Sequence, residues 1–168
     1  MIDESIIADI ETKGDNFKPL FLLMQNSGII FKNRRLVGAL GLATFDCIYL
    51  NMDALKHKPS DLYFFVILHE MAHHKRISKL GKEYFLKLFS DNDFDVFSNG
   101  VINEEIIADR YGCYVYKCLT NKNFPIYLTQ QLDRKYKQDQ YKDQIKGLFG
   151  LVKNSENNYI KLMESFLI

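Results

Sequence analysis

The sequence predicts an α+β fold, in which a small, mostly antiparallel sheet is followed by a predominantly helical C-terminal half. Residues 29–52 are rich in Ile, Val, Leu, Phe and Tyr and contain two glycines, which is typical of short strands. The later segments instead carry apolar residues at helical spacing. The chain has 168 residues, of which 47% are hydrophobic and 26% charged, so we expect one domain with its own core and exclude a disordered chain.

Helices are also expected on the N-terminal side of the strand-rich segment. An isoleucine at every fourth position of residues 2–12 predicts an amphipathic helix. A second helix over about 16–26 can end at Gly28, because glycine readily adopts the left-handed conformation that follows many helices. Three short strands should then occupy residues 29–32, 36–45 and 47–51.

The second half of the chain should be helical. Ser60 and Asp61 follow Pro59 and predict the start of a helix that runs to about residue 78. The further elements expected are a short helix over 82–89, a polar loop over 90–100, a long helix over 101–119, a helix opened by Pro125 and an amphipathic tail over 155–168. We interpret residues 1–168 as a single domain, in which residues 120–168 form an unassigned helical extension.

Composition narrows the choice of partners and of compartment. The formal net charge is +1, so nothing draws the whole chain to nucleic acid or to an anionic membrane. Three cysteines without a C-x-x-C pair predict reduced thiols in the cytoplasm. The acidic N-terminus lacks the features of a signal peptide, and the longest apolar stretch, residues 63–68, is too short to span a bilayer. We therefore expect a cytoplasmic protein that binds neither nucleic acid nor a membrane.

The most informative residues form the pattern H-E-x-x-H, from His69 through Glu70 to His73. On a helix, residues four apart lie on one face, so the two histidines can offer two imidazoles to one tetrahedral Zn²⁺. The Glu70 carboxylate lies beside them, where it can reach a water rather than the metal. A buried glutamate between two inward histidines is costly unless something compensates its charge. The alternative is a buried helix whose histidines are satisfied by core partners.

A catalytic zinc site needs a third protein ligand, and no histidine follows His74, so we expect a carboxylate. In the long helix, Glu105 and Asp109 lie four residues apart on the inward face. Glu105 would bind the metal, and Asp109 would accept the free ring N–H of a ligand histidine. Glu104 is the rival ligand, but no second carboxylate lies four residues after it. Gly112 should let this helix pack closely against the histidine helix.

These two motifs together resemble those of the gluzincin zinc peptidases. The chain is similar to HtpX-like enzymes, which carry E-x-x-x-D on the later helix, and to the small intracellular peptidases of the ImmA/IrrE group, which carry E-x-x-A-N. The resemblance covers about residues 35–115 and implies a zincin-like domain. It implies His69, His73 and Glu105 as zinc ligands and Glu70 as the general base.

The resemblance also implies a substrate site and shows two departures. An edge strand between Val37 and Phe45 would pair with an extended protein or peptide substrate. Asp109 replaces the Asn of the ImmA/IrrE group, and the transmembrane helices of the HtpX-like enzymes are absent. The residue that would stabilise the oxyanion stays open among Tyr84, Tyr111 and Tyr114.

The expected function is that of a zinc-dependent endopeptidase, in which Glu70 takes a proton from the attacking water. The alternative is a zincin-fold structural or interaction subunit with little or no proteolytic activity, which would use residues 120–168 as an assembly surface. A high content of Lys, Asn and Ile suits an AT-rich genome, so a bacterial or phage origin, with association with the virion, belongs to that alternative.

Overall fold

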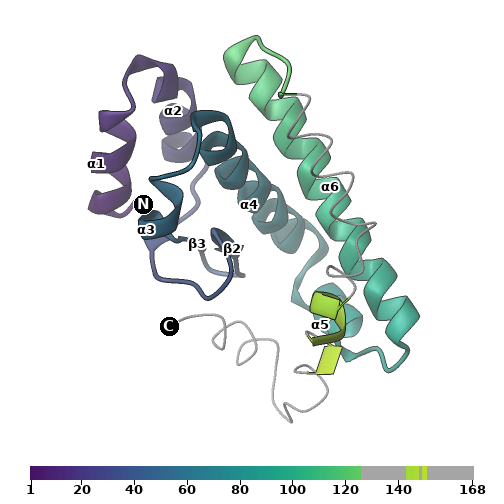
Figure 1. The fold of residues 1–168 in the computed structure, drawn as a ribbon. Coiled ribbons are helices and arrows are strands. Elements are labelled where there is room, and N and C mark those ends of the chain that lie inside the picture. The colour runs from purple at the N-terminus through teal and green to yellow at the C-terminus, as the bar shows by residue number, and fades with distance from the viewer. Residues whose placement is uncertain (126–142, 148, 151–168) are drawn as a thin grey trace.

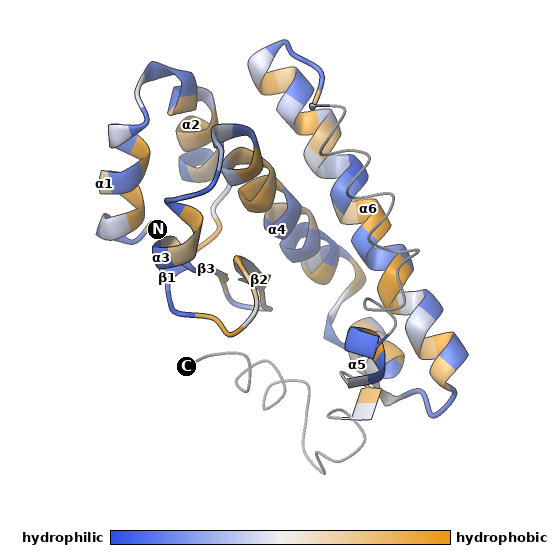
Figure 2. Cartoon of the chain, in the orientation of Figure 1, coloured by the Kyte–Doolittle hydropathy of each residue, from blue (hydrophilic) through white to orange (hydrophobic). Residues whose placement is uncertain are grey.

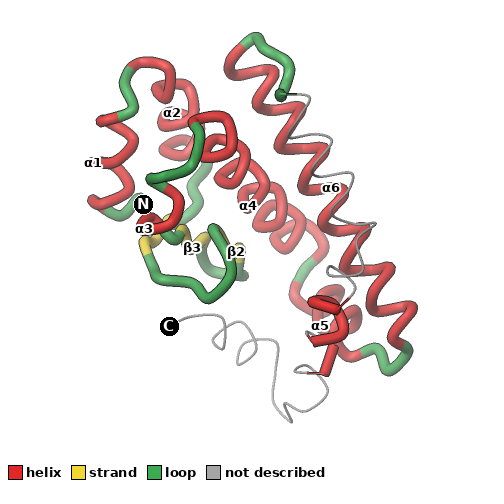
Figure 3. The backbone as a smooth tube through the Cα atoms, in the orientation of Figure 1, coloured by secondary structure: helices red, strands yellow, loops and turns green. Residues whose placement is uncertain are grey.

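Helices lie on both sides of a short run of strands along the chain (Figure 1). The structure is a computed structural model, and it describes residues 1–125, 143–147 and 149–150. Helix is the dominant secondary structure of this part (Figure 3). The elements are α1 (Glu4–Thr12), the 3-10 helix η1 (Asp15–Phe17), α2 (Lys18–Asn26), β1 (Phe31–Asn33), β2 (Gly41–Ala43), β3 (Ile48–Leu50), α3 (Met52–Leu55), α4 (Ser60–Leu80), α5 (Lys82–Ser90) and α6 (Phe94–Thr120). The α+β prediction is confirmed at this level.

The sheet has the strand order β1-β3-β2 and mixes two pairing directions. β2 runs antiparallel to β3, whereas β1 runs parallel to it. The expectation of a mostly antiparallel sheet is therefore wrong. A tight turn joins β2 to β3, in which the Thr44 amide donates to the Cys47 carbonyl at 2.9 Å. The connection over residues 34–40 carries the chain past the place of β3, so β3 is inserted between the other two strands and runs parallel to β1.

The strand expected over residues 36–45 is mostly a loop. Gly38 has a φ of 70°, which belongs to the left-handed region and interrupts an extended strand. The side chain of Asn51 donates to the carbonyls of Leu36 and Ala39 at 3.1 and 3.3 Å and holds this loop against β3. What remains as strand is β2, which lies at the edge of the sheet in the part of the chain that the structure describes.

α4 is the central helix of the core. It packs against the sheet on one side and against α6 on another (Figure 1). Its first half is hydrophobic, and hydrophilic residues begin near its middle (Figure 2). Edge-to-face aromatic packing stabilises the first half. The ring centroids of Tyr63 and Phe17 are 5.3 Å apart, and those of Phe64 and Tyr116 are 5.6 Å apart. The H-E-x-x-H residues therefore lie on a helix whose position is fixed by buried neighbours.

α6 begins earlier than the sequence predicts. The expected polar loop over 90–100 is wrong, because the helix starts at Phe94. The side chain of Asp93 accepts hydrogen bonds from two backbone N–H groups of the first turn and caps the helix. Phe97 is buried within this additional part of the helix. The helix ends at Thr120, close to the predicted residue 119, and Asn121 after it has a left-handed φ of 55°.

α4 and α6 approach closely at Gly112, as predicted. A β-carbon at this position would lie 3.0 Å from the ring of Phe65 and 3.6 Å from the backbone nitrogen of His69. One turn further along α6, the hydroxyl of Tyr116 donates to the carboxylate of Asp61 on α4. These contacts hold α6 against the face of α4 that carries the histidines.

Some predictions concern residues outside the described part. The helix expected after Pro125 falls on residues 126–142, and the amphipathic tail falls on residues 151–168. Residues 143–147 are helical. Among the described residues, no helix combines the length and the apolar character that a membrane crossing requires.

Candidate metal centre

The side chains of His69, His73 and Glu105 converge where α4 passes α6. One ligand atom from each residue lies within 4.8 Å of the others. The Nε2 atoms of the two histidines are 3.0 Å apart. Glu105 Oε1 lies 3.2 Å from His73 Nε2, and Glu105 Oε2 lies 3.7 Å from His69 Nε2. The structure therefore brings together the three residues that the sequence predicts as ligands.

Asp109 sets the orientation of one of these histidines. Its Oδ1 lies 2.8 Å from His69 Nδ1. An ionised carboxylate only accepts hydrogen bonds, so Nδ1–H of His69 donates, and Nε2 of the neutral ring keeps its lone pair toward Glu105 and His73. Asp109 can reach the ring because it lies one turn after Glu105 on the same face of α6. The predicted contact between Asp109 and one of the two motif histidines is therefore present.

The donor set suits zinc. Two imidazoles and one carboxylate form a ligand set of catalytic zinc sites. Bonds of about 2.1 Å in a tetrahedral arrangement hold the ligand atoms about 3.4 Å apart. The separations of 3.0, 3.2 and 3.7 Å found here bracket that value. The side chain of Glu105 is 23% exposed, so the centre can be reached from solvent.

Negative charge accumulates around the two imidazoles. Burial alone would lower the pKa of His69, but the hydrogen bond to Asp109 and the charges of Glu105 and Glu70 raise it to about 9. In the absence of a metal, a proton on His69 balances part of the carboxylate charge. A divalent cation would displace this proton and balance the charge more completely.

Glu70 is buried between α4 and β2. A β-carbon on Gly41 would lie 2.6 Å from its Cγ, and the backbone amide of Ala43 donates a hydrogen bond to its carboxylate. Burial raises the pKa of Glu70, and the neighbouring His69 and His73 lower it in part. The raised pKa means that the Glu70 carboxylate, beside the two histidines, has an increased affinity for a proton.

The rival carboxylate has a different partner. Arg76 on α4 donates from Nη2 to Glu104 Oε1 at 2.7 Å and from Nε to Glu104 Oε2 at 2.5 Å. The hydroxyl of Tyr84 on α5 also donates to Glu104 Oε1, at 3.2 Å. This bidentate pair, in which Glu104 is buried and Arg76 is half-buried, joins the two helices and occupies both oxygens of Glu104. Of the two candidates, Glu105 is therefore the residue that faces the histidines.

The sequence reasoning missed two residues of these surroundings. Arg76 could have been found as the cation three residues after His73, since a buried carboxylate such as Glu104 needs a positive partner. No feature of the sequence indicated that Gly41 would lie near the site. Its contact with Glu70 depends on how the sheet lies on α4, which no local pattern reports.

The three tyrosines considered for the oxyanion differ in their positions. The hydroxyl of Tyr84 donates to Glu104, the carboxylate that is paired with Arg76. The hydroxyl of Tyr111 instead accepts a hydrogen bond from Lys75 Nζ at 2.7 Å, and the side chain of Tyr114 is 69% exposed.

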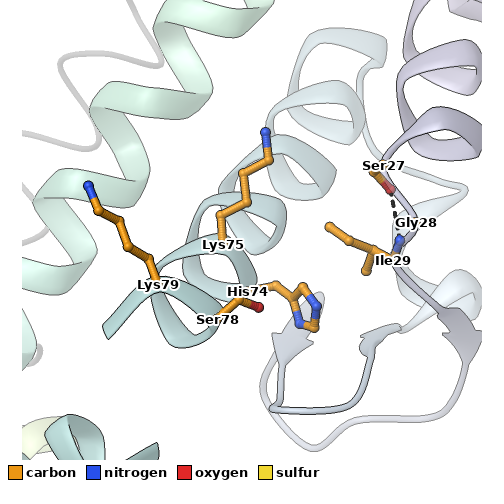
Figure 4. A pocket seen from close by; sticks show the side chains of 7 residues that line it. All are labelled: Ser27, Gly28, Ile29, His74, Lys75, Ser78 and Lys79. Carbon is orange, nitrogen blue, oxygen red and sulfur yellow. Dashed lines mark hydrogen bonds between the residues drawn. The ribbon is translucent and has the colours of Figure 1, made fainter. Parts of the chain in front are cut away.

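His74 points away from the other two histidines. Its Nδ1 donates to the carbonyl of Thr44 at 2.9 Å. It borders an open hollow between α4 and the segment after α2 (Figure 4). The residues that line this hollow are Ser27, Gly28, Ile29, His74, Lys75, Ser78 and Lys79. The hollow is lined by none of the three candidate ligands.

Comparisons of the chain with family models, with curated proteins and with solved structures found no match.

Proposed function

We propose that the protein is a zinc-dependent endopeptidase of the gluzincin type. The main support is the convergence of His69, His73 and Glu105 from two helices, with Asp109 bonded to His69. Without a metal, one proton shared between the two Nε2 atoms at 3.0 Å can hold the histidines together. The approach of Glu105 oxygens to both Nε2 atoms, with Asp109 on the far nitrogen of His69, is what favours a metal over that alternative.

Zinc, when bound, would supply the Lewis acidity that activates water and polarises the scissile carbonyl. His69, His73 and Glu105 would hold it, and Asp109 would keep His69 Nε2 available as a donor atom. The Glu70 carboxylate would accept a proton from the attacking water and deliver it to the leaving amine nitrogen. The burial that raises the pKa of Glu70 supports this role, because it increases the affinity of the carboxylate for that proton.

The edge strand supports a peptide substrate. An extended peptide can add to an exposed sheet edge through backbone hydrogen bonds, which do not depend on the side chains of the peptide. β2 offers such an edge in the described part of the chain. Glu70 lies against the same strand, at Gly41 and Ala43. A peptide paired with β2 would therefore have its backbone near the proposed base.

A comparison of Glu70→Gln with the wild type tests the proposal. Glu70→Gln should keep the zinc content of the wild type, because Glu70 is not a ligand, while cleavage of an unfolded protein substrate should fall by at least about 100-fold. Glu83→Gln on the exposed side of α5 is the matched control and should change neither property. Mass spectrometry of the products identifies newly formed termini within the substrate.

The outcome separates the peptidase from a structural or interaction subunit. Zinc-loaded wild type that cleaves none of a broad set of peptides, or Glu70→Gln that cleaves as fast as the wild type, would contradict the peptidase. Loss of zinc in Glu70→Gln would instead show that Glu70 is a ligand, and the assigned roles would have to change.

A further inference from the structure

Gly41 of the edge strand lies so close to the side chain of Glu70 that there is no room between them for a β-carbon. A β-carbon built on Gly41 would lie 2.6 Å from Glu70 Cγ, 3.0 Å from Cδ and 3.0 Å from Oε1. These three atoms are the nearest that such a β-carbon would meet, and all belong to Glu70. Separations below 3.0 Å are essentially never found for real β-carbons. The glycine therefore provides space that one particular side chain occupies.

The backbone does not itself demand a glycine at this position. Gly41 keeps a negative φ and pairs with Leu50 in the antiparallel ladder of β2 and β3. Gly38 in the preceding loop is different, because its φ of 70° is unfavourable for other residues whatever space surrounds it. A glycine inside a strand weakens the strand, so its presence indicates a close approach by another group. Here the approaching group is Glu70.

Glu70 has little freedom to move aside. The clashing atom is Cγ, in the middle of the side chain, and the carboxylate beyond it is buried. The amide of Ala43, two residues along β2, donates to this carboxylate. Gly41 therefore supplies space beside Glu70, and the backbone of Ala43, two residues along the strand, supplies a hydrogen bond to its carboxylate.

We propose that Gly41 is a positioning residue for Glu70, because the missing β-carbon lets the glutamate lie against β2 with its carboxylate beside the ligand histidines. The catalytic consequence rests on the proposed function, since a displaced Glu70 slows cleavage only if Glu70 is the base. The three atoms nearest to a β-carbon at position 41 belong to Glu70 and not to a candidate metal ligand. A side chain at position 41 should therefore affect the base and leave metal binding intact.

A double-mutant cycle tests the positioning without any assay of activity. Gly41→Ala is made in three backgrounds of the full chain, namely wild type, Glu70→Gln and Glu70→Ala. It should lower the melting temperature by about 3–10 °C in the wild type and in Glu70→Gln, because both retain Cγ at position 70. In Glu70→Ala the clashing atoms are gone, so Gly41→Ala should be neutral or should raise the melting temperature by restricting the unfolded chain.

The neighbouring residue on the strand provides the control. Leu42 points to the opposite face of the sheet, so Leu42→Ala should shift the melting temperature equally in the wild type and in Glu70→Ala. Equal shifts for Gly41→Ala in these two backgrounds would overturn the proposal. A difference between the two backgrounds that appears for Gly41→Ala and not for Leu42→Ala is the expected result.

The consequence for catalysis is measured separately. Gly41→Ala should bind as much zinc as the wild type, while kcat for peptide cleavage should fall by about 100-fold through misplacement of the base. Retained zinc with an unchanged kcat would overturn the positioning of a base. If the zinc-loaded wild type cleaves nothing, the proposed function fails, and the thermal cycle still decides whether Gly41 positions Glu70.

Discussion

His69 Nδ1 lies 2.8 Å from Asp109 Oδ1, so a carboxylate on α6 sets the tautomer of a histidine on α4. The preceding turn of α6 carries Glu105, whose oxygens lie near Nε2 of His69 and of His73. Asp109 and Glu105, one turn apart on α6, thus lie beside the two different nitrogens of the His69 ring. This relationship makes the geometry of the centre depend on how the two helices pack.

Removal of the Asp109 carboxylate should weaken the metal site without removing a ligand. Asp109→Ala frees the ring of His69 to rotate and to change tautomer, so we expect zinc affinity to fall about 10–100-fold. Competition with a chromophoric chelator measures this change. Asp95→Ala, at an exposed position of the same helix, is the control and should bind zinc like the wild type. Equal affinities for Asp109→Ala and the control would contradict the role of Asp109.

The pKa of His69 predicts how the stability of metal-free protein depends on pH. The folded-state pKa of about 9 lies above the ordinary value of 6.5, so the folded state binds this proton more tightly than the unfolded chain does. The resulting stability is complete below about pH 6.5 and is lost as the pH rises through about 9. The loss should be on the order of 3 kcal/mol in the free energy of unfolding.

Urea titrations of chelator-treated protein between pH 6 and 10 measure this effect. Tyrosines and thiols titrate in the same range, so the informative quantity is the difference between the wild type and His69→Gln at each pH. This difference should shrink as the pH rises. A difference that is independent of pH, or that grows, would contradict the raised pKa of His69.

The pair of Arg76 and Glu104 should contribute to the packing of α4 on α6. Arg76→Ala leaves the buried carboxylate of Glu104 without its cation, and we expect a loss of about 2–4 kcal/mol in the free energy of unfolding. Arg76→Lys should recover only part of this, because an ammonium group does not reproduce the bidentate geometry. The double variant Arg76→Met with Glu104→Met should be more stable than Arg76→Ala. Urea denaturation of the wild type and the three variants gives their free energies of unfolding. An Arg76→Ala variant as stable as the wild type would contradict a stabilising role of the Arg76–Glu104 pair.

Gly112 tests whether the helix contact controls the metal site. Gly112→Val places a branched side chain where even a β-carbon would lie 3.0 Å from the Phe65 ring. We expect a cost of about 1–3 kcal/mol and a weaker zinc site, because α6 carries Glu105 away from α4 as it shifts. Thermal unfolding and zinc competition are measured on the same preparation. A destabilised variant with unchanged zinc affinity would show that the centre tolerates movement of α6.

The parts of the site that could be read from the sequence are the local ones. His69 and His73 share a helix face by spacing alone, and Glu105 with Asp109 repeats that spacing on α6. The choice between Glu105 and Glu104 was weaker in the sequence and is clear in the structure, where Arg76 takes Glu104. Contacts between residues far apart in the sequence leave no regular spacing in it, because they depend on how whole helices and strands pack.

The fold shows the same division between local and distant information. The helices over residues 2–12 and 60–78 follow from apolar spacing and capping residues and were predicted to within a few positions. The parallel pairing of β1 with β3 was not predicted, because strand order depends on where the connection after β1 leads. The early start of α6 was missed although Asp93 is a good cap, because the polar residues that follow it resemble a loop.

Elemental analysis of metal content tests the central claim most directly. The chain is purified without added metal and then after incubation with zinc, as wild type, as Glu105→Gln and as Glu83→Gln. We predict about one zinc per chain in the wild type and in Glu83→Gln, and little or none in Glu105→Gln. A wild type that takes up no zinc even after incubation, or a Glu105→Gln variant that keeps its zinc, would contradict a metal centre formed by His69, His73 and Glu105.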